Sequence, residues 1–137
     1  MNYQSVYTKP ETKKEASAQK RINIVEIQNG DYSSLSGTWK NAEGHTIVFD
    51  KNGLVSEHSE IFTAKPEKDA TVLRLGVRAK SGMGGHFIIV IPAGSEALEV
   101  NNGDGTKSPA QSDNSRDRLY AGQDYSGKPE HFYYKVD

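Results

Sequence analysis

The residues of this sequence that could carry out hydrolysis are gathered in one short polar stretch, Glu57-His58-Ser59-Glu60. Two carboxyl groups at a defined separation can act as the acid and the base of glycoside hydrolysis, and a histidine between them can be oriented or charged by either one. Glu57, His58 and Glu60 are therefore the candidate catalytic residues. The alternative is a solvated surface cluster, because nothing in the sequence fixes the distance between the carboxyl groups. The sequence has no Gly-x-Ser-x-Gly motif and no cysteine to serve as a nucleophile.

A second group of polar residues lies in a region rich in Gly and Asn, residues 93–117. Carboxylate and amide oxygens from such loops suit Ca²⁺. The candidate calcium ligands are Asn101, Asp104, Asp113 and Asp117. The stretch lacks the later glutamate of an EF-hand, and the same residues can form Asx turns without a metal, so both interpretations stay open. The four histidines do not have the spacing of a zinc site, and we expect no cofactor.

A third candidate is an aromatic ligand site around Trp39, the only tryptophan. Trp39 either lines a ligand cavity or fills one end of the core against tyrosines from the closing strands, including Tyr134. A single tryptophan in a small β domain favours packing, with a hydrogen-bond partner for its ring N–H. The candidate ligand-binding residues are Trp39, Arg118, Tyr120, Tyr133 and Lys135.

These candidates must be positioned by β-strands. Residues 31–49 predict a short polar lead-in and a β-hairpin, in which Gly44 provides the turn and apolar residues alternate in the returning strand. Residues 71–80 alternate most clearly, and residues 86–92 are apolar throughout, which predicts a central strand covered on both faces. Further strands are expected at residues 54–56, 61–63, 118–123 and 131–136, with a loop at 64–69 and an irregular region at 93–117.

The N-terminal part of the chain divides into two segments. Residues 1–20 have a linker composition and predict a disordered tether, with a frayed terminus or an exposed helix as alternatives. Residues 21–30 favour a short helix that begins after Asn23, ends at Gly30 and caps the sheet, although their β-branched content leaves a strand possible. The prediction is a single all-β domain over residues 21–137: an antiparallel meander of about eight strands that forms a small barrel or a sandwich.

The block GDYSSLSGTWKNAEGHTIVFDKNGLVS, together with DRLYAGQ and FYYKV, resembles a domain family of unknown function. That family is found in surface lipoproteins and secreted proteins of lactic-acid bacteria and related Gram-positive organisms. The resemblance spans most of residues 22 to 137, and the family has no established activity to transfer. The shorter piece GTWKNAEGHTIVF is also similar to the opening of avidin-like and lipocalin β-barrels, which implies a barrel fold and supports function only by analogy. The lipocalin resemblance implies a basic residue, Arg118 or Lys135, over the indole of Trp39 in a cation–π contact.

Composition narrows the range of partners. The net charge is -1, from 17 Lys and Arg against 18 Asp and Glu, so the charge balance gives no indication of nucleic acid or of an anionic membrane. The resemblance implies an extracellular setting, either secreted or attached to the cell surface by a lipid anchor outside these 137 residues. We expect a monomeric, non-catalytic module that binds a small molecule, a glycan or a surface protein. The alternatives are a hydrolase acting on cell-wall or host polymers and a structural interaction domain without a pocket.

Overall fold

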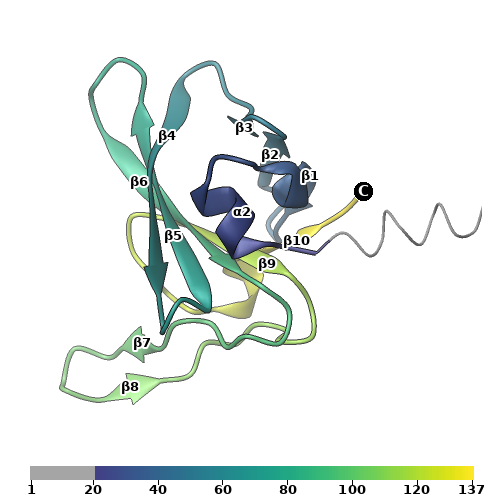
Figure 1. Cartoon of the computed structure of the whole chain (residues 1–137). Helices are drawn as coiled ribbons and strands as arrows, with labels where there is room; N and C mark the ends of the chain where they lie inside the picture. Colours follow the sequence, from purple (N-terminus) through teal and green to yellow (C-terminus); the bar gives the residue numbers. More distant parts are fainter. Residues whose placement is uncertain (1–20) are drawn as a thin grey trace, which may run out of the picture.

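The computed structural model describes residues 21–137, and the predicted tether lies outside them (Figure 1). Eight strands form one antiparallel sheet, in the order β3-β2-β1-β10-β9-β6-β5-β4, that is nearly closed into a barrel. The strands of this sheet are β1 (Gly37–Lys40), β2 (Thr46–Asp50), β3 (Gly53–Leu54), β4 (Ser59–Glu67), β5 (Val72–Ala79), β6 (Gly85–Ile91), β9 (Arg118–Gly122) and β10 (Phe132–Lys135). A separate two-stranded hairpin contains β7 (Val100–Asn101) and β8 (Lys107–Ser108).

The strands follow one another around the barrel in chain order. Each pairs with its sequence neighbour in the sheet, β10 pairs with β1, and the seam lies between β3 and β4, which are not hydrogen-bonded to each other. The long connection between β6 and β9 carries the β7–β8 hairpin, which lies below the barrel in Figure 1. The predicted antiparallel meander of about eight strands is confirmed.

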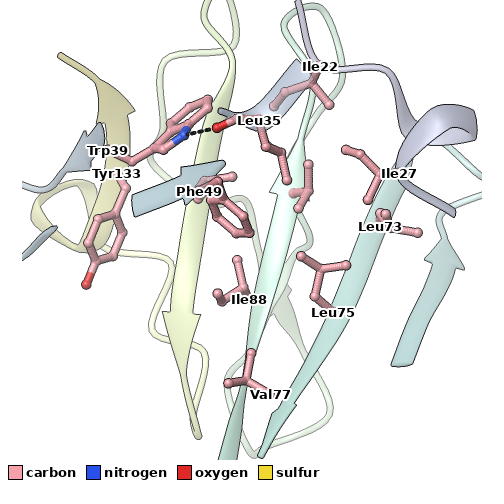
Figure 2. Close-up of a cluster of buried hydrophobic side chains, with 12 residues drawn as sticks. Ile22, Ile27, Leu35, Trp39, Phe49, Leu73, Leu75, Val77, Ile88 and Tyr133 are labelled. Atoms are coloured by element: carbon pink, nitrogen blue, oxygen red, sulfur yellow. Dashed lines mark hydrogen bonds between the residues drawn. The ribbon is translucent and has the colours of Figure 1, made fainter. Parts of the chain in front are cut away.

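The inner core follows from the alternation of the strands. Leu73, Leu75 and Val77 of β5 point inward with Ile88 of β6, and all four are at most 1% exposed (Figure 2). Because side chains alternate across a strand, the intervening Arg74 and Gly76 belong to the outer face. The other fully or largely buried members of this cluster are Ile22, Ile27, Leu35, Trp39, Phe49, Val90, Leu119 and Tyr133.

One end of the barrel is closed by the helix α2 (Ile24–Gln28) and the 3-10 helix η1 (Ser33–Leu35). The predicted helix cap is confirmed: the side-chain oxygen of Asn23 accepts a hydrogen bond from the Glu26 N–H at 3.1 Å. The N–H of Asn23 in turn donates to Ser34 Oγ at 3.0 Å, which ties α2 to η1. Ile27 and Leu35 from these two elements are buried in the inner core.

A second core covers the outer face of the same sheet. Ile89 and Ile91 of β6, Tyr120 of β9 and Phe132 of β10 pack with Ala97 from the long connection. The partly buried members of this outer cluster are Phe87, Leu98, Ala110, Tyr125 and Tyr134. The segments 92–117 and 123–131 therefore form a layer over the outside of the barrel, and β6 is covered on both faces as its apolar sequence predicts.

Three local expectations differ from the structure. β4 runs to Glu67, so the loop expected at residues 64–69 is a strand for most of its length, and only residues 68–71 turn. Pro66 is tolerated there because β4 is an edge strand whose outer side has no ladder partner. β3 ends at Leu54, and the region expected to be irregular contains the β7–β8 hairpin. In residues 21–137, no helix is long and apolar enough to cross a membrane.

Candidate functional site

The best candidate site is a cavity of about 390 Å³ at one mouth of the barrel. Its apolar wall comes from the inner face of the sheet, with Ile47 on β2, Ile88 on β6 and Ala121 on β9. Ile88 lies nearer to Val77 than Ile22 and Leu35 do (Figure 2), and the lining residue His86 is opposite Val77 in register. The complete lining of this mouth pocket is Thr46, Ile47, Val48, Leu54, Val55, Ser56, Ser59, His86, Ile88, Ala121 and Tyr133. The volume is within the range of small-molecule sites, roughly 300–1,000 Å³.

The mouth pocket opens where the barrel is least closed. Leu54 and Ser59 flank the seam between β3 and β4, and both also line an adjoining cavity of about 260 Å³. That second cavity reaches Tyr32 and Lys80 along the outside of the seam. The short β3 strand is the local cause, because two residues of ladder do not extend far enough along the barrel to pair with β4.

Two titratable side chains give the rim its polar character. Burial raises the pKa of the Tyr133 hydroxyl, and the nearby carboxylate of Glu43 and Tyr120 raise it further. Partial burial lowers the pKa of His86, although this residue remains exposed overall at the start of β6. Tyr133 is therefore a neutral hydrogen-bond donor at pH 7, and His86 is a neutral imidazole that can both donate and accept.

The mouth pocket contains no Asp, Glu, Lys or Arg among its lining residues. Besides His86 and Tyr133, the polar groups are the hydroxyls of Thr46, Ser56 and Ser59. Hydroxyl and imidazole groups over an apolar floor can orient an uncharged ligand by hydrogen bonds while the floor removes its apolar surface from water. An ionised ligand would gain no charge partner from this lining and would lose hydration.

Trp39 is packed in the inner core and does not line the mouth pocket. Its side chain is 1% exposed, and its indole N–H donates to the Leu35 carbonyl at 2.9 Å (Figure 2). Figure 2 shows Tyr133 beside Trp39, with its hydroxyl pointing away from the indole. The packing interpretation of Trp39 therefore describes the structure, and the tyrosine is the aromatic residue that reaches the cavity.

Arg118 lies on the other face of the sheet from Trp39. In register it is opposite Tyr134, a member of the outer cluster, whereas the neighbouring Leu119 is opposite Tyr133 and points inward. Its guanidinium is fully buried and is saturated by five hydrogen bonds from the covering layer. The acceptors are Ser112 Oγ (2.9 Å), Pro92 O (3.2 Å), Arg116 O (3.1 Å), Ser95 O (2.6 Å) and Asn114 Oδ1 (2.7 Å).

The other two aromatic-site candidates are divided between the same two faces. Tyr120 is opposite Phe132 in the outer cluster, and its hydroxyl donates to the Asp124 carbonyl at 2.9 Å. Lys135 is opposite Trp39 in register, and its Cε packs over Gly37. The cation–π pairs that the structure shows in residues 21–137 join Arg74 with Phe87, Arg78 with Phe62 and Arg116 with Tyr134, so the predicted pair over the indole is not among them.

The candidate catalytic residues are not arranged around a cleft. Glu57 and His58 are exposed on the connection between β3 and β4. The carboxylate of Glu60 accepts a hydrogen bond from the guanidinium Nε of Arg78 at 2.9 Å on the outer face. Glu60 also lines the adjoining cavity at the seam, whereas Glu57 and His58 line neither this cavity nor the mouth pocket.

The four calcium candidates each accept hydrogen bonds from nearby groups. Asp104 is bonded to Thr106 and Asp113 to Ser115, and in each case the hydroxyl bond lowers the pKa of an exposed carboxyl group. Asn101 accepts from the Gly103 N–H at 3.0 Å. Asp117 accepts from the backbone N–H groups of Ile22 (3.0 Å) and Ala93 (2.7 Å). Over residues 21–137 the structure shows no group of three or more His, Cys, Asp or Glu placed to hold a metal ion.

Sequence reasoning identified Tyr133 but missed the rest of the mouth pocket. The lining comes from five separate segments of the chain, which only the closure of the barrel brings together. Two signals were available in the sequence. Ile47 is an inward position of a clearly alternating strand, and His86 is a polar residue at the entrance of an otherwise apolar strand.

Comparison with known proteins adds one finding. Residues 2–137 match the family described as a domain of unknown function, DUF6287. No curated protein and no solved structure matches the chain.

Proposed function

We propose that this chain, which belongs to the DUF6287 family of domains of unknown function, is a non-catalytic module that binds a small uncharged molecule in the mouth pocket. The observation that carries the proposal is the combination of an apolar floor with a rim of neutral hydrogen-bonding groups. A ligand that fits this lining has a compact apolar body and one or more hydroxyl or amide groups. Uncharged glycosides and small aromatic alcohols or amides have this chemistry.

The orientation of the ligand follows from the positions of the polar groups. His86 and Tyr133 stand on β6 and β10, while the three hydroxyl residues come from β2 and from the seam around β3 and β4. The apolar side chains Ile47, Ile88 and Ala121 lie on the floor of the same cavity. The apolar part of the ligand therefore enters first, and its polar groups remain at the rim, where they can bond both to the protein and to water.

The first test is a titration with uncharged glycosides and aryl alcohols, followed by ¹H–¹⁵N chemical-shift changes of the backbone amides. We expect shifts concentrated at residues 46–48, 86–88 and 121, with charged analogues of the same size binding at least tenfold more weakly. Ala121→Phe fills the cavity and should abolish the shifts. Ala42→Phe is the matched control, because Ala42 is an exposed turn residue outside the pocket.

A milder variant is needed because Ala121→Phe could disturb the fold as well as fill the cavity. Tyr133→Phe removes one hydroxyl and keeps the packing beside Trp39, so it should weaken binding by about tenfold, a change near 1.4 kcal/mol for a lost hydrogen bond. The proposal is wrong if folded wild-type protein shows no localised shifts, or if the shifts survive Ala121→Phe unchanged. Trp39 emission should stay blue-shifted and resistant to iodide throughout, because the indole is buried.

We further propose that the module works outside the cell as a monomer, either secreted or attached to the surface, where its ligand could be part of a glycan or of a surface protein. The support is the sequence resemblance to surface lipoproteins and secreted proteins of lactic-acid bacteria. Protease treatment of intact producing cells tests the location: the domain should be digested while a cytoplasmic marker is spared. Light scattering after size-exclusion chromatography tests the monomer, which should have a mass near 15.1 kDa.

A further inference from the structure

We propose that Ser126 is an activated serine that accepts an acyl group from small activated esters, with His131 as the base and Glu43 as the residue that positions it. Ser126 Oγ lies 2.6 Å from His131 Nδ1. The other ring nitrogen of His131, Nε2, lies 3.8 Å from Glu43 Oε2. A hydroxyl bonded to an imidazole that a carboxylate orients is the arrangement by which proteins activate a serine for nucleophilic attack.

The surrounding hydrogen bonds indicate where the hydroxyl proton of Ser126 points. The Tyr120 hydroxyl donates its proton to the Asp124 carbonyl and accepts one from the Ser126 N–H at 2.8 Å. The Lys128 N–H donates to Ser126 Oγ at 3.2 Å. The Tyr120 hydroxyl also lies 3.2 Å from Ser126 Oγ. His131 Nδ1, at 2.6 Å, is the nearest acceptor for the Ser126 hydroxyl proton.

At 3.8 Å the Glu43 carboxylate acts on His131 through its charge and not through a hydrogen bond, and its position favours the tautomer that the serine bond requires. A carboxylate facing Nε2 favours the proton on that nitrogen, which leaves Nδ1 with a free lone pair for the serine hydroxyl. The other oxygen of Glu43 faces His45 Nδ1 at 3.8 Å, so the same carboxylate is held between two imidazoles in the β1–β2 turn. The site is therefore assembled from three segments: the β1–β2 turn, the segment after β9 and the 3-10 helix η2 (Pro129–His131).

The Ser126 site is partly exposed and adjoins the mouth pocket, because the Glu43 carboxylate lies near enough to Tyr133 to raise the pKa of its hydroxyl. The side chains of His131 and Glu43 are 33% and 47% exposed, and Ser126 is half-buried. None of the three residues lines the mouth pocket. We therefore expect a small electrophile to approach Ser126 from the solvent side of His131.

The reaction is acyl transfer from an activated carboxylic ester. Ser126 Oγ forms a bond to the carbonyl carbon while its proton moves to His131 Nδ1. The ester C–O bond then breaks, and the leaving alcohol takes that proton from Nδ1. The products are one acylated serine and one alcohol, and we expect one adduct per chain, so this is a covalent modification site that is compatible with a non-catalytic role.

The test uses a fluorophosphonate probe on the purified full chain, with intact-mass analysis and peptide mapping. The same attack on phosphorus displaces fluoride, so we expect one adduct on the peptide that contains Ser126. Ser126→Ala should remove the adduct. His131→Ala should slow labelling at least tenfold, and added imidazole should restore it, which a merely structural role of His131 would not allow. Glu43→Gln should slow labelling several-fold while circular dichroism stays unchanged.

Ser115→Ala is the matched control. Its hydroxyl also makes a short 2.6 Å bond, but to the carboxylate of Asp113, with no imidazole to take the proton. Labelling should be unaffected in this variant. If Ser126→Ala is unfolded by dichroism, the imidazole rescue of His131→Ala decides the question. The proposal is overturned if the folded wild type gives no adduct on Ser126, if other serines are labelled equally, or if the rate is the same without His131.

Discussion

The two faces of the sheet are both buried, but by different means. The inner face is filled by residues of the strands themselves, such as Leu75, Ile88 and Leu119, together with side chains from α2 and η1. The outer face of β6, β9 and β10 is covered by segments with almost no regular structure, which contribute isolated apolar residues such as Ala97 and Tyr125. One layer is held by hydrophobic packing, and the other is held largely by hydrogen bonds.

Arg118 shows how the outer layer replaces regular structure. Irregular backbone leaves carbonyl groups without ladder partners, and a buried carbonyl without a partner costs free energy. The planar guanidinium has five N–H donors, and here all its contacts are to groups of the layer that begins at Pro92. The Arg118 guanidinium therefore supplies this layer with hydrogen-bond donors, as a neighbouring strand does within the barrel. We therefore expect inner-face mutations to lower the stability of the whole domain and outer-face mutations to loosen only the covering layer.

The largest expected effect is from Trp39→Ala on the inner face. Truncation of a fully buried tryptophan costs roughly 3–5 kcal/mol, and here the Leu35 carbonyl also loses its donor. Urea denaturation followed by far-ultraviolet circular dichroism should show a single transition at much lower urea. Trp39→Phe should retain most of the packing and therefore lose less of the free energy of unfolding. A loss below about 1 kcal/mol for the alanine variant would show that the closed end of the barrel is not part of the cooperative core.

Arg118→Met should give the next largest effect, about 3 kcal/mol, because it leaves buried carbonyls of the covering layer without donors. The effect should be local. Hydrogen exchange should become faster across residues 92–117, with little change in the amides of β5. Arg118→Lys keeps the charge but not the planar fork, so it should rescue only part of the loss. Equal acceleration in β5 would contradict the idea of two separately stabilised faces.

Asp117→Ala tests the contact between the segment before α2 and the covering layer, and it should lower the free energy of unfolding by about 1–2 kcal/mol. One carboxylate oxygen accepts from the Ile22 N–H, ahead of α2, and the other from the Ala93 N–H at the start of the covering layer. Loss of both bonds removes charge-assisted contacts to two backbone groups. We expect faster exchange of those two amides together. If only the Ala93 amide responds, α2 is held by its apolar contacts alone.

The inner face could be predicted from the sequence because its physical cause is local. Alternation placed Leu73, Leu75 and Val77 on one side, and the cap at Asn23 satisfied a rule that involves only its immediate neighbours. The apolar run 86–92 also showed that something must cover both faces of β6. It did not show what, because Ala97 and Tyr125 have no periodicity and are assigned to a core only by contacts distant in sequence.

The predicted site residues show the same limit, because contacts between residues distant in sequence decide which of them meet. Tyr133 was found because an aromatic residue in a closing strand has few alternatives to packing or binding. Arg118 was one of two candidates, with Lys135, for the contact over the indole that the lipocalin resemblance implies. One residue of register decides the face of Arg118, and pairing with Tyr134 puts it outside. The mouth pocket depends on barrel closure and on the shortness of β3, neither of which any single segment encodes.

The smallest expected effect concerns the pH dependence of stability through His86. Its pKa is lowered in the folded protein, so the unfolded chain takes up the proton first as the pH falls. Stability should therefore decrease on acidification from the ordinary histidine range, near pH 6.5, down to the folded-state pKa, and no further below it. His86→Gln should reduce this decrease, by no more than about 2 °C in Tm because the residue is largely open to solvent. The control is His58→Gln, which removes an exposed histidine outside the mouth pocket. A steeper acid decrease in His86→Gln than in the wild type would mean that protonated His86 stabilises the rim, and the mouth pocket would then favour an anionic ligand.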